Sequence, residues 1–186
     1  MTKKELATGE YTVLAMLRLG PKHGYEMARF MERDGLPDVI RLEQSLLYAN
    51  LKNLERRGLI EGCEQRTGAH PPRRVFHLTP AGEVLVDAWL RAPSERMRDV
   101  RLDFLLKLYF LHQIDAAAEA TLLEQQIAAC QVYRSRVVAQ IAHTEPTGFQ
   151  KLVLGSKASA AIATLSWLQE YADELIATKH DIEVTA

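Results

Sequence analysis

The sequence predicts a mainly α-helical protein with one small β-hairpin, organised as two domains over residues 1–92 and 93–186. Three observations support this fold class. Residues 43–57 place apolar side chains at the spacing of a helix. Two short strand-like segments follow them, separated by a turn that contains glycine and proline. The second half of the chain shows helical periodicity and no convincing strand pattern.

The helix at residues 43–57 has one apolar and one polar face. Leu47, Leu51 and Leu54 recur at four and three residues and form the apolar stripe. The side chains that project away from this stripe are those of Tyr48, Lys52, Asn53 and Arg56. Gly58 follows the last basic residues, where a left-handed C-terminal cap needs a residue without a Cβ atom. We therefore expect the helix to end there, with one face buried and the other free to contact a partner.

Two strands are expected after this helix, at residues 59–63 and 73–78. Gly68, Pro71 and Pro72 lie between them and cannot continue a paired ladder, so this segment is expected to form the tip of a hairpin. A helix with an adjoining β-ribbon is typical of a winged helix-turn-helix domain. In that fold the helix enters the major groove of DNA and the ribbon lies along the backbone or minor groove.

Short helices are expected on both sides of this unit. Residues 11–19 and 25–33 predict two helices with a turn at residues 22–24 between them, and Glu43 or Ser45 is expected to cap the third.

Thr79 and Pro80 supply a capping hydroxyl and a proline at the first position of a fourth helix, which Pro93 ends. The face of this helix that we expect to be buried carries Ala81, Val84, Leu85, Ala88 and Trp89.

The second half is expected to be a helical dimerisation domain. Residues 101–111 predict a buried helix, and the helix after Asp115 has an apolar stripe with Arg134 on its line. We expect this arginine at the edge of the stripe, with its head group in water. The last helix, residues 149–178, has a second stripe that includes Ala161, Ile162, Leu165, Leu168 and Ile176. This stripe favours a dimer-forming helix pair, and the alternative is a three-helix bundle within one chain.

Composition excludes several classes of protein. The chain is 47% apolar and 25% charged, as in globular proteins, and its net charge is −1. Between Arg41 and Arg74 there are seven Lys/Arg and four Asp/Glu residues, a local excess of +3 that an ordinary solvated surface also explains. The only two cysteines, Cys63 and Cys130, lie far apart, which argues against a disulfide framework or a metal site and favours a cytoplasmic protein with reduced thiols.

Neither a membrane protein nor an enzyme is expected. The N-terminus lacks the apolar core of a signal peptide, and the sequence has no membrane-length apolar run. It also has no glycine-rich phosphate loop, no nucleophile elbow and no cluster of metal ligands. We therefore expect no cofactor and no metal.

Three blocks of sequence in the first half resemble the winged-helix domain of the PadR family of bacterial transcriptional regulators. They are LGPKHGYEM at 19–27, LLYANLKNLERRGLIE at 46–61 and RRVFHLTPAGEVLV at 73–86. The segment VRLDFLLKLYFL at 100–111 resembles the start of the C-terminal domain of members with a long helical dimerisation region. The resemblance implies a homodimeric repressor that binds a palindromic operator in double-stranded DNA. Response to a small aromatic effector is common in that family.

The sequence departs from the family at the start of the third helix. Members commonly have Gly-Thr-Leu-Tyr-Pro there, and this chain has the residues Ser45, Leu46, Leu47, Tyr48 and Ala49. Leu46 stands where the family has threonine, so this chain lacks a hydroxyl that could reach a phosphate. The individual operator contacts of the family therefore do not carry over to this chain.

Candidate DNA contacts lie on this helix and on the hairpin. The helix contributes Ser45, Tyr48, Asn50, Lys52, Asn53 and Arg56, and the hairpin contributes Arg66, His70, Arg73 and Arg74. A tyrosine hydroxyl and the cations suit phosphates, and an asparagine amide suits an adenine edge. The alternatives are a tyrosine partly buried against the hairpin and cations that are merely solvated.

Arg73 and Arg74 are adjacent on a strand, so one is expected to face DNA and the other the body of the domain. For His23, a capping or core hydrogen bond is preferred to a DNA contact, and Gly24 is expected to serve close packing.

The aromatic residues Trp89, Trp167 and Tyr171 are candidates for the lining of a ligand cavity, and the alternative is that they are plain core. The preferred interpretation is a sequence-specific, ligand-responsive repressor that acts as a homodimer. The other is a winged-helix module that contacts protein without binding DNA.

Overall fold

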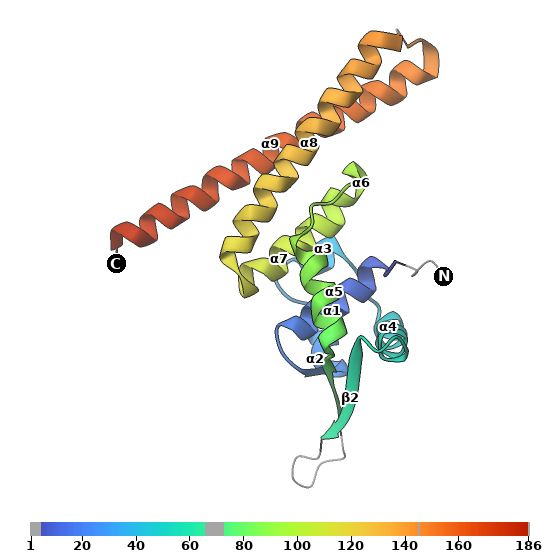
Figure 1. The fold of residues 1–186 in the computed structure, drawn as a ribbon, viewed down its shortest axis with the longest axis vertical. Helices are drawn as coiled ribbons and strands as arrows, with labels where there is room; N and C mark the ends of the chain where they lie inside the picture. Colours follow the sequence, from blue (N-terminus) through green and yellow to red (C-terminus); the bar gives the residue numbers. More distant parts are fainter. Residues whose placement is uncertain (1–4, 66–72, 145, 186) are drawn as a thin grey trace. The chain divides into compact units, whose positions relative to one another are not determined.

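The computed structural model describes residues 5–65, 73–144 and 146–185, with side chains described as far as residue 177. The chain forms two compact units. The first contains residues 1–92 and 101–115, and the second contains residues 93–100 and 116–186. The fold is mainly α with a small antiparallel sheet, as predicted (Figure 1). The assignment of separate functions to residues 1–92 and 93–186 stays a prediction.

The first unit is a winged-helix unit with short elements. They are α1 (Thr8–Arg18), β1 (Lys22–His23), α2 (Gly24–Phe30), α3 (Leu36–Val39), α4 (Gln44–Arg56), β2 (Ile60–Gln65), β3 (Arg73–Leu78), α5 (Pro80–Arg91) and α7 (Leu105–Ile114). A short α6 (Met97–Asp99) and a π-helical turn (Val100–Phe104) precede α7 in the chain. We call β2 and β3 the wing.

The sheet has three strands in the order β1-β3-β2, and both pairings are antiparallel. In the wing, Ile60 lies opposite Leu78 and Gln65 opposite Arg73. Residues 22–24 were expected to be only a turn, and that prediction was incomplete. Lys22 and His23 pair with β3, about fifty residues away in the chain, so no local sequence pattern signals this strand.

The end of α4 confirms the predicted glycine cap. Gly58 has φ +68°, its N–H donates to Glu55 O at 2.9 Å, and the Leu59 N–H donates to Leu54 O at 3.0 Å. This is the hydrogen-bond pattern of a Schellman motif. The prediction for the other end was wrong in part, because Glu43 occupies the N-cap position but no side chain caps the helix.

Helix α5 begins as predicted but buries a different face. Thr79 Oγ1 accepts from Gly82 N at 3.2 Å and donates to Gly58 O at 2.7 Å. The predicted face was wrong, because Val84 is 74% exposed while Gly82, Val86 and Leu90 are buried. A Cβ atom on Gly82 would lie only 2.0 Å from Leu59 O. The helix therefore approaches the neighbouring backbone at its glycine, which a stripe of apolar side chains does not indicate.

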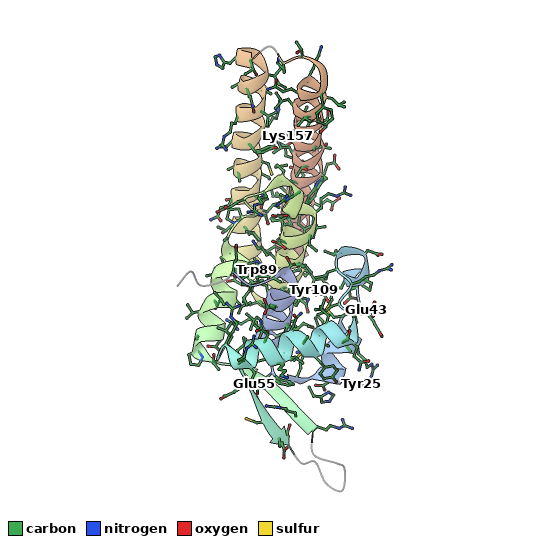
Figure 2. All side chains as sticks on the ribbon, turned by 90° about the vertical axis from the view of Figure 1, so that its right-hand side faces the viewer. Tyr25, Glu43, Glu55, Trp89, Tyr109 and Lys157 are labelled. Atoms are coloured by element: carbon green, nitrogen blue, oxygen red, sulfur yellow. The ribbon has the colours of Figure 1, made fainter. Side chains whose placement is uncertain are left out.

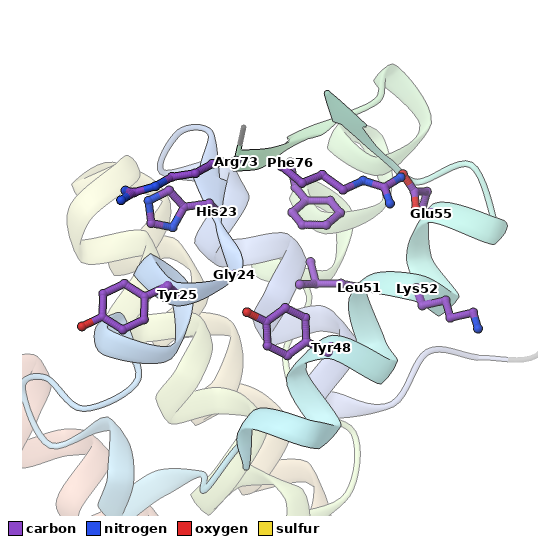
Figure 3. A pocket seen from close by; sticks show the side chains of 10 residues that line it. His23, Gly24, Tyr25, Tyr48, Leu51, Lys52, Glu55, Arg73 and Phe76 are labelled. Carbon is purple, nitrogen blue, oxygen red and sulfur yellow. The ribbon is translucent and has the colours of Figure 1, made fainter. Parts of the chain in front are cut away.

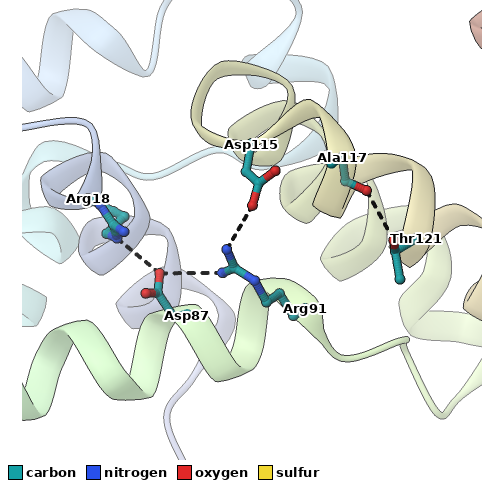
Figure 4. Close-up of polar contacts among 6 residues, drawn as sticks. All are labelled: Arg18, Asp87, Arg91, Asp115, Ala117 and Thr121. Atoms are coloured by element: carbon teal, nitrogen blue, oxygen red, sulfur yellow. Dashed lines mark hydrogen bonds and ion pairs between the residues drawn. The ribbon is translucent and has the colours of Figure 1, made fainter.

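An ion-pair network joins α1, α5 and the end of α7 within the first unit (Figure 4). Asp87 Oδ1 lies 2.9 Å from Arg18 Nε and 3.7 Å from Arg91 Nη1. Arg91 Nη2 reaches Asp115 Oδ2 at 3.0 Å. These side chains are about one-third exposed or more, so each pair contributes little, on the order of 0.5 kcal/mol.

The second unit contains two long helices, α8 (Ala116–Thr144) and α9 (Gly148–Thr185), which lie side by side (Figure 1). In α8, Cys130 and Val137 are buried and Arg134 is exposed, as predicted. The α9 stripe is confirmed in part. Its buried side chains include Leu154, Ala161, Leu165 and Leu168, but Ile162 and Ile176 face outward. In the described ranges, no helix is both long enough and apolar enough to span a membrane.

Candidate nucleic-acid interface

Helix α4 presents a free face beside the wing. Leu47, Leu51 and Leu54 are buried, which confirms the predicted apolar stripe. Tyr48 is 46% exposed, and Lys52 is also exposed. Figure 2 shows α4 running across this unit beside the wing strands, with Glu55 at the end of the helix.

A pocket of about 720 Å³ lies between α4, the wing strand β3 and the start of α2. Its lining consists of His23, Gly24, Tyr25, Tyr48, Leu51, Lys52, Glu55, Arg73, Arg74 and Phe76. Figure 3 shows Arg73 and Lys52 at opposite ends of this pocket, with Tyr48 and Phe76 between them. Three cations and one carboxylate face it, so its formal charge is positive, which suits an anionic partner.

The start of α2 shapes one wall of the pocket. His23 caps this helix, because its Nδ1 accepts from Glu26 N at 3.2 Å and its own N–H donates to Glu26 Oε2 at 3.0 Å. The predicted capping role of His23 is therefore confirmed. A Cβ atom on Gly24 would lie 2.7 Å from the Tyr48 ring, so the absence of a side chain at Gly24 leaves room for this ring. Tyr48 therefore lies against Gly24 of α2 and lines the pocket, while 46% of the residue stays exposed.

Three candidate contacts have no partner among the described residues. Tyr48, Lys52 and Arg73 form neither a hydrogen bond nor an ion pair within that part of the chain. Ser45 is also exposed near the start of α4. Unpaired donors on an exposed face are available to bind phosphate oxygens.

The two asparagines of α4 are turned toward the protein. Asn50 is buried, and its Nδ2 lies 3.0 Å from where a Cβ atom on Gly9 would be. Asn53 donates through Nδ2 to the carboxylate of Glu10 and accepts through Oδ1 from Arg56. Both amides are engaged or covered because this side of α4 packs on α1. In this arrangement neither amide is free to reach a base edge.

Glu10 links α1 to α4. Its side chain is buried, and Oε2 accepts from Ala7 N at 2.8 Å, which closes the first turn of α1. Oε1 accepts the hydrogen bond from Asn53. The sequence did not single out Glu10, since a capping glutamate also occurs in helices that contact nothing else.

The two wing arginines have different surroundings. Arg74 Nη2 lies 2.6 Å from Glu55 Oε1, and its guanidinium lies 5.6 Å from the centroid of the Phe76 ring. Arg73 has no such contact among the described residues. Both arginines line the pocket, so the expectation that one faces DNA and the other the body of the domain stays a prediction. The candidates Arg66 and His70 lie outside the described residues.

The candidate ligand residues belong to different units. Trp89 stacks on Tyr11 with ring centroids 4.9 Å apart, and Lys107 Nζ lies 5.1 Å from the centroid of the same indole. In the second unit Tyr171 donates to Glu119 Oε1 at 2.8 Å, and burial, followed by this hydrogen bond, raises the pKa of its phenol. Trp167 also lies in the second unit. Their role in binding a ligand stays a prediction.

Two family models match parts of this chain. Residues 13–88 match the model of the transcriptional regulator PadR-like family, and residues 100–175 match the model named virulence activator alpha C-term. The negative transcriptional regulator PadR of Bacillus subtilis (strain 168) is 24% identical over 170 residues, which cover 86% of this chain and 93% of that protein.

Two similar solved structures come from the same genus. Bacillus subtilis PadR in complex with operator DNA is 22% identical, with 92% of this chain and 99% of that chain covered and a TM-score of 0.47. The PadR-like transcriptional regulator from Bacillus cereus is 21% identical, with 94% and 99% covered and a TM-score of 0.43.

Proposed function

Because this chain belongs to the PadR-like family of transcriptional regulators, we propose that it is a sequence-specific DNA-binding repressor that acts as a homodimer. One observation carries the DNA-binding part of the proposal. Tyr48, Lys52 and Arg73 are unpaired donors that share one positively charged pocket between α4 and the wing. Winged-helix proteins use this region for the major groove and the adjoining backbone.

The proposed contacts divide between phosphates and bases. Tyr48, Lys52 and Arg73 bind phosphate oxygens, and Arg56 adds the guanidinium hydrogens that Asn53 leaves free. Ser45 and Leu46 lie exposed in the first turn of α4, which in helix-turn-helix proteins is the part closest to the base edges. Arg66 and His70 remain candidates on the basis of sequence.

Exposed aliphatic side chains on the second unit support the homodimer. Leu152 and Ile162 on α9 are more than half exposed, as are Val132 and Val138 on α8. Apolar side chains that face outward from two long helices favour association with a second copy. In the dimer, two copies of α4 would enter major grooves one helical turn apart, about 34 Å.

Repression is proposed from the relative in Bacillus subtilis, which is named a negative transcriptional regulator. Binding at a promoter would exclude the transcription machinery. A small aromatic effector would release the DNA, and its candidate contacts are either Trp89 in the first unit or Trp167 and Tyr171 in the second. The proposed role places the protein in the cytoplasm, together with the DNA.

A gel-shift series with the DNA upstream of its own gene tests the proposal. We expect saturable binding whose affinity falls steeply as salt increases, because phosphate contacts release counterions. Charge reversal at Lys52 or Arg73 should abolish this binding. Arg101→Glu, at an exposed cation outside the pocket lining, is the control that retains it. Equal affinity for all three variants would instead favour the protein-contacting module, and no saturable binding by the intact protein would refute the proposal.

A further inference from the structure

One carboxylate oxygen joins the wing to the end of α4. Glu55 Oε1 lies 2.6 Å from Arg74 Nη2 of β3 and accepts from Gly62 N of β2 at 3.1 Å. Both strands of the wing are therefore tied to the last turn of α4 through a single side chain. An acidic residue in this position is unexpected, because its charge would repel a DNA backbone that α4 and the wing approach together.

Arg74, the partner of Glu55, also contacts an aromatic ring and lies close to a glycine. Its guanidinium lies over the Phe76 ring, which is itself buried. A Cβ atom on Gly62 would lie 2.4 Å from Arg74 Nε, so the arginine crosses the opposite strand where that strand has no side chain. The ion pair and the ring therefore position the guanidinium of Arg74, although 55% of its side chain is exposed.

The two wing arginines differ in whether a carboxylate neutralises them. Glu55 and Arg74 neutralise each other, and Arg74 donates to the Glu55 carboxylate through Nη2. Arg73 and Lys52 are left as the cations of the pocket without a partner in the described residues. An arginine bound to a carboxylate and stacked on an aromatic ring is costly to redirect toward a phosphate.

We infer that Glu55 and Arg74 are positioning residues, which set the angle of the wing against α4, and that Arg74 is not a phosphate contact. The inference rests on the proposed DNA-binding function. It predicts that removal of the negative charge at Glu55 lowers DNA affinity, although the protein becomes more positive. If Glu55 merely repelled DNA, the same change would raise the affinity.

The test compares four proteins by the salt dependence of their affinity for the same operator. Arg73→Ala should lower affinity about tenfold and reduce the slope of log K against log salt by about 0.9, the value for one lost phosphate contact. Arg74→Met keeps the stem over Phe76 and should lower affinity with the slope unchanged. Glu55→Gln keeps an acceptor for Gly62 N, and it should also lower affinity, by about fivefold, with the slope unchanged.

A charge exchange provides the rescue. Glu55→Arg and Arg74→Glu should each weaken binding severely. The double variant should recover part of the lost affinity relative to both, because the ion pair to β3 forms again in reverse while the hydrogen bond from Gly62 N stays lost. Melting curves of every variant are the control for an intact fold. A reduced salt slope for Arg74→Met, or an increased affinity for Glu55→Gln, would overturn the inference.

Hydrogen exchange separates this inference from the proposed function. Without any DNA, Glu55→Gln should speed amide exchange in β2 and β3 at least severalfold relative to α1, because the wing loses its attachment to α4. Unchanged exchange in the wing would refute positioning by Glu55 even if the wild type binds DNA. Faster wing exchange in Glu55→Gln, combined with a wild type that binds no DNA, would support the attachment and refute only the proposed function.

Discussion

The two units of this protein are stabilised by different means. In the first, short elements meet at glycines: Gly58 ends α4, Gly24 makes room for Tyr48, and Gly82 lets α5 approach the Leu59 carbonyl. In the second, two long helices pack through side chains, and Gly155 has no atom within 4 Å of where a Cβ would be. The first unit therefore adds close backbone contacts to its apolar core, whereas the second depends on covering the apolar faces of its helices.

The exposed side chains differ in the same way. Around the pocket of the first unit, the exposed large residues are mostly tyrosines and cations, which are suited to polar contacts. The second unit exposes the aliphatic side chains Val132, Val138, Leu152, Ile162 and Ile176. In the proposed homodimer, these aliphatic side chains of the second unit are the ones against which a second copy would pack.

The largest expected effect is the disruption of the proposed dimer. Leu152→Glu combined with Ile162→Glu should convert a dimer to monomers. Four apolar side chains at about 1.5 kcal/mol each give roughly 6 kcal/mol of association free energy. Sedimentation equilibrium measures the change. Val84→Glu, at an exposed apolar position of α5 in the first unit, is the control and should leave the dimer intact. A wild type that sediments as a monomer contradicts the prediction.

The next prediction concerns the close backbone approach in the first unit. Gly82→Ala should lower the free energy of unfolding by about 3 kcal/mol, because the new methyl would overlap the Leu59 carbonyl. Gly155→Ala in α9 should do the reverse and stabilise the protein by about 0.5–1 kcal/mol, since it meets open space in a helix. Urea unfolding measures both. Equal effects at the two glycines would contradict the contrast between the units.

On the free face of α4, Lys52→Ala should weaken operator binding about tenfold, or roughly 1.4 kcal/mol, and reduce the salt slope by about 0.9. Arg56→Ala should have a smaller effect on affinity, because Asn53 already engages part of that guanidinium. Fluorescence anisotropy at several salt concentrations separates the two. A larger loss of affinity for Arg56→Ala than for Lys52→Ala would contradict this prediction.

The smallest expected effect tests a side-chain contact in the second unit. Tyr171→Phe should lower the free energy of unfolding by about 1 kcal/mol at pH 7, because buried Glu119 loses a hydrogen-bond donor. Burial, followed by that hydrogen bond, raises the pKa of Tyr171 above its ordinary value of 10.0. Its contribution is therefore fully present below about pH 10 and is lost as the pH rises through the folded pKa. Urea unfolding of both proteins between pH 7 and 11 should show the stability gap constant at first and then closing.

Sequence patterns predicted the parts of the fold that depend on neighbours in the chain. Gly58, Thr79 and the strand at residues 73–78 all carry local signals, and the structure has each where it was expected. The face of α5 was predicted wrongly, because its closest contact is made by Gly82, which has no side chain to count. Strand β1 was missed because its pairing partner is distant in the chain.

The candidate site was predicted in outline rather than in detail. Periodicity placed Tyr48 and Lys52 on the free face of α4, where the structure has them exposed. It also placed Asn53 there, but a residue at the edge of an apolar stripe lies close to the neighbouring helix, and Asn53 bonds to Glu10. The pairing of Glu55 with Arg74 joins residues nineteen apart through the hairpin geometry, and no spacing rule indicates it.

The two thiols of the chain have opposite surroundings. Cys63 is exposed on β2, whereas Cys130 is buried in α8, where burial raises its pKa and keeps it in the unreactive thiol form. A maleimide reagent should therefore attach to the wing alone, without any engineered cysteine. A spin label at Cys63 would give one reporter on each copy, and the distance between two such labels in an assembly of two chains would measure directly how far apart DNA or an effector holds the wings.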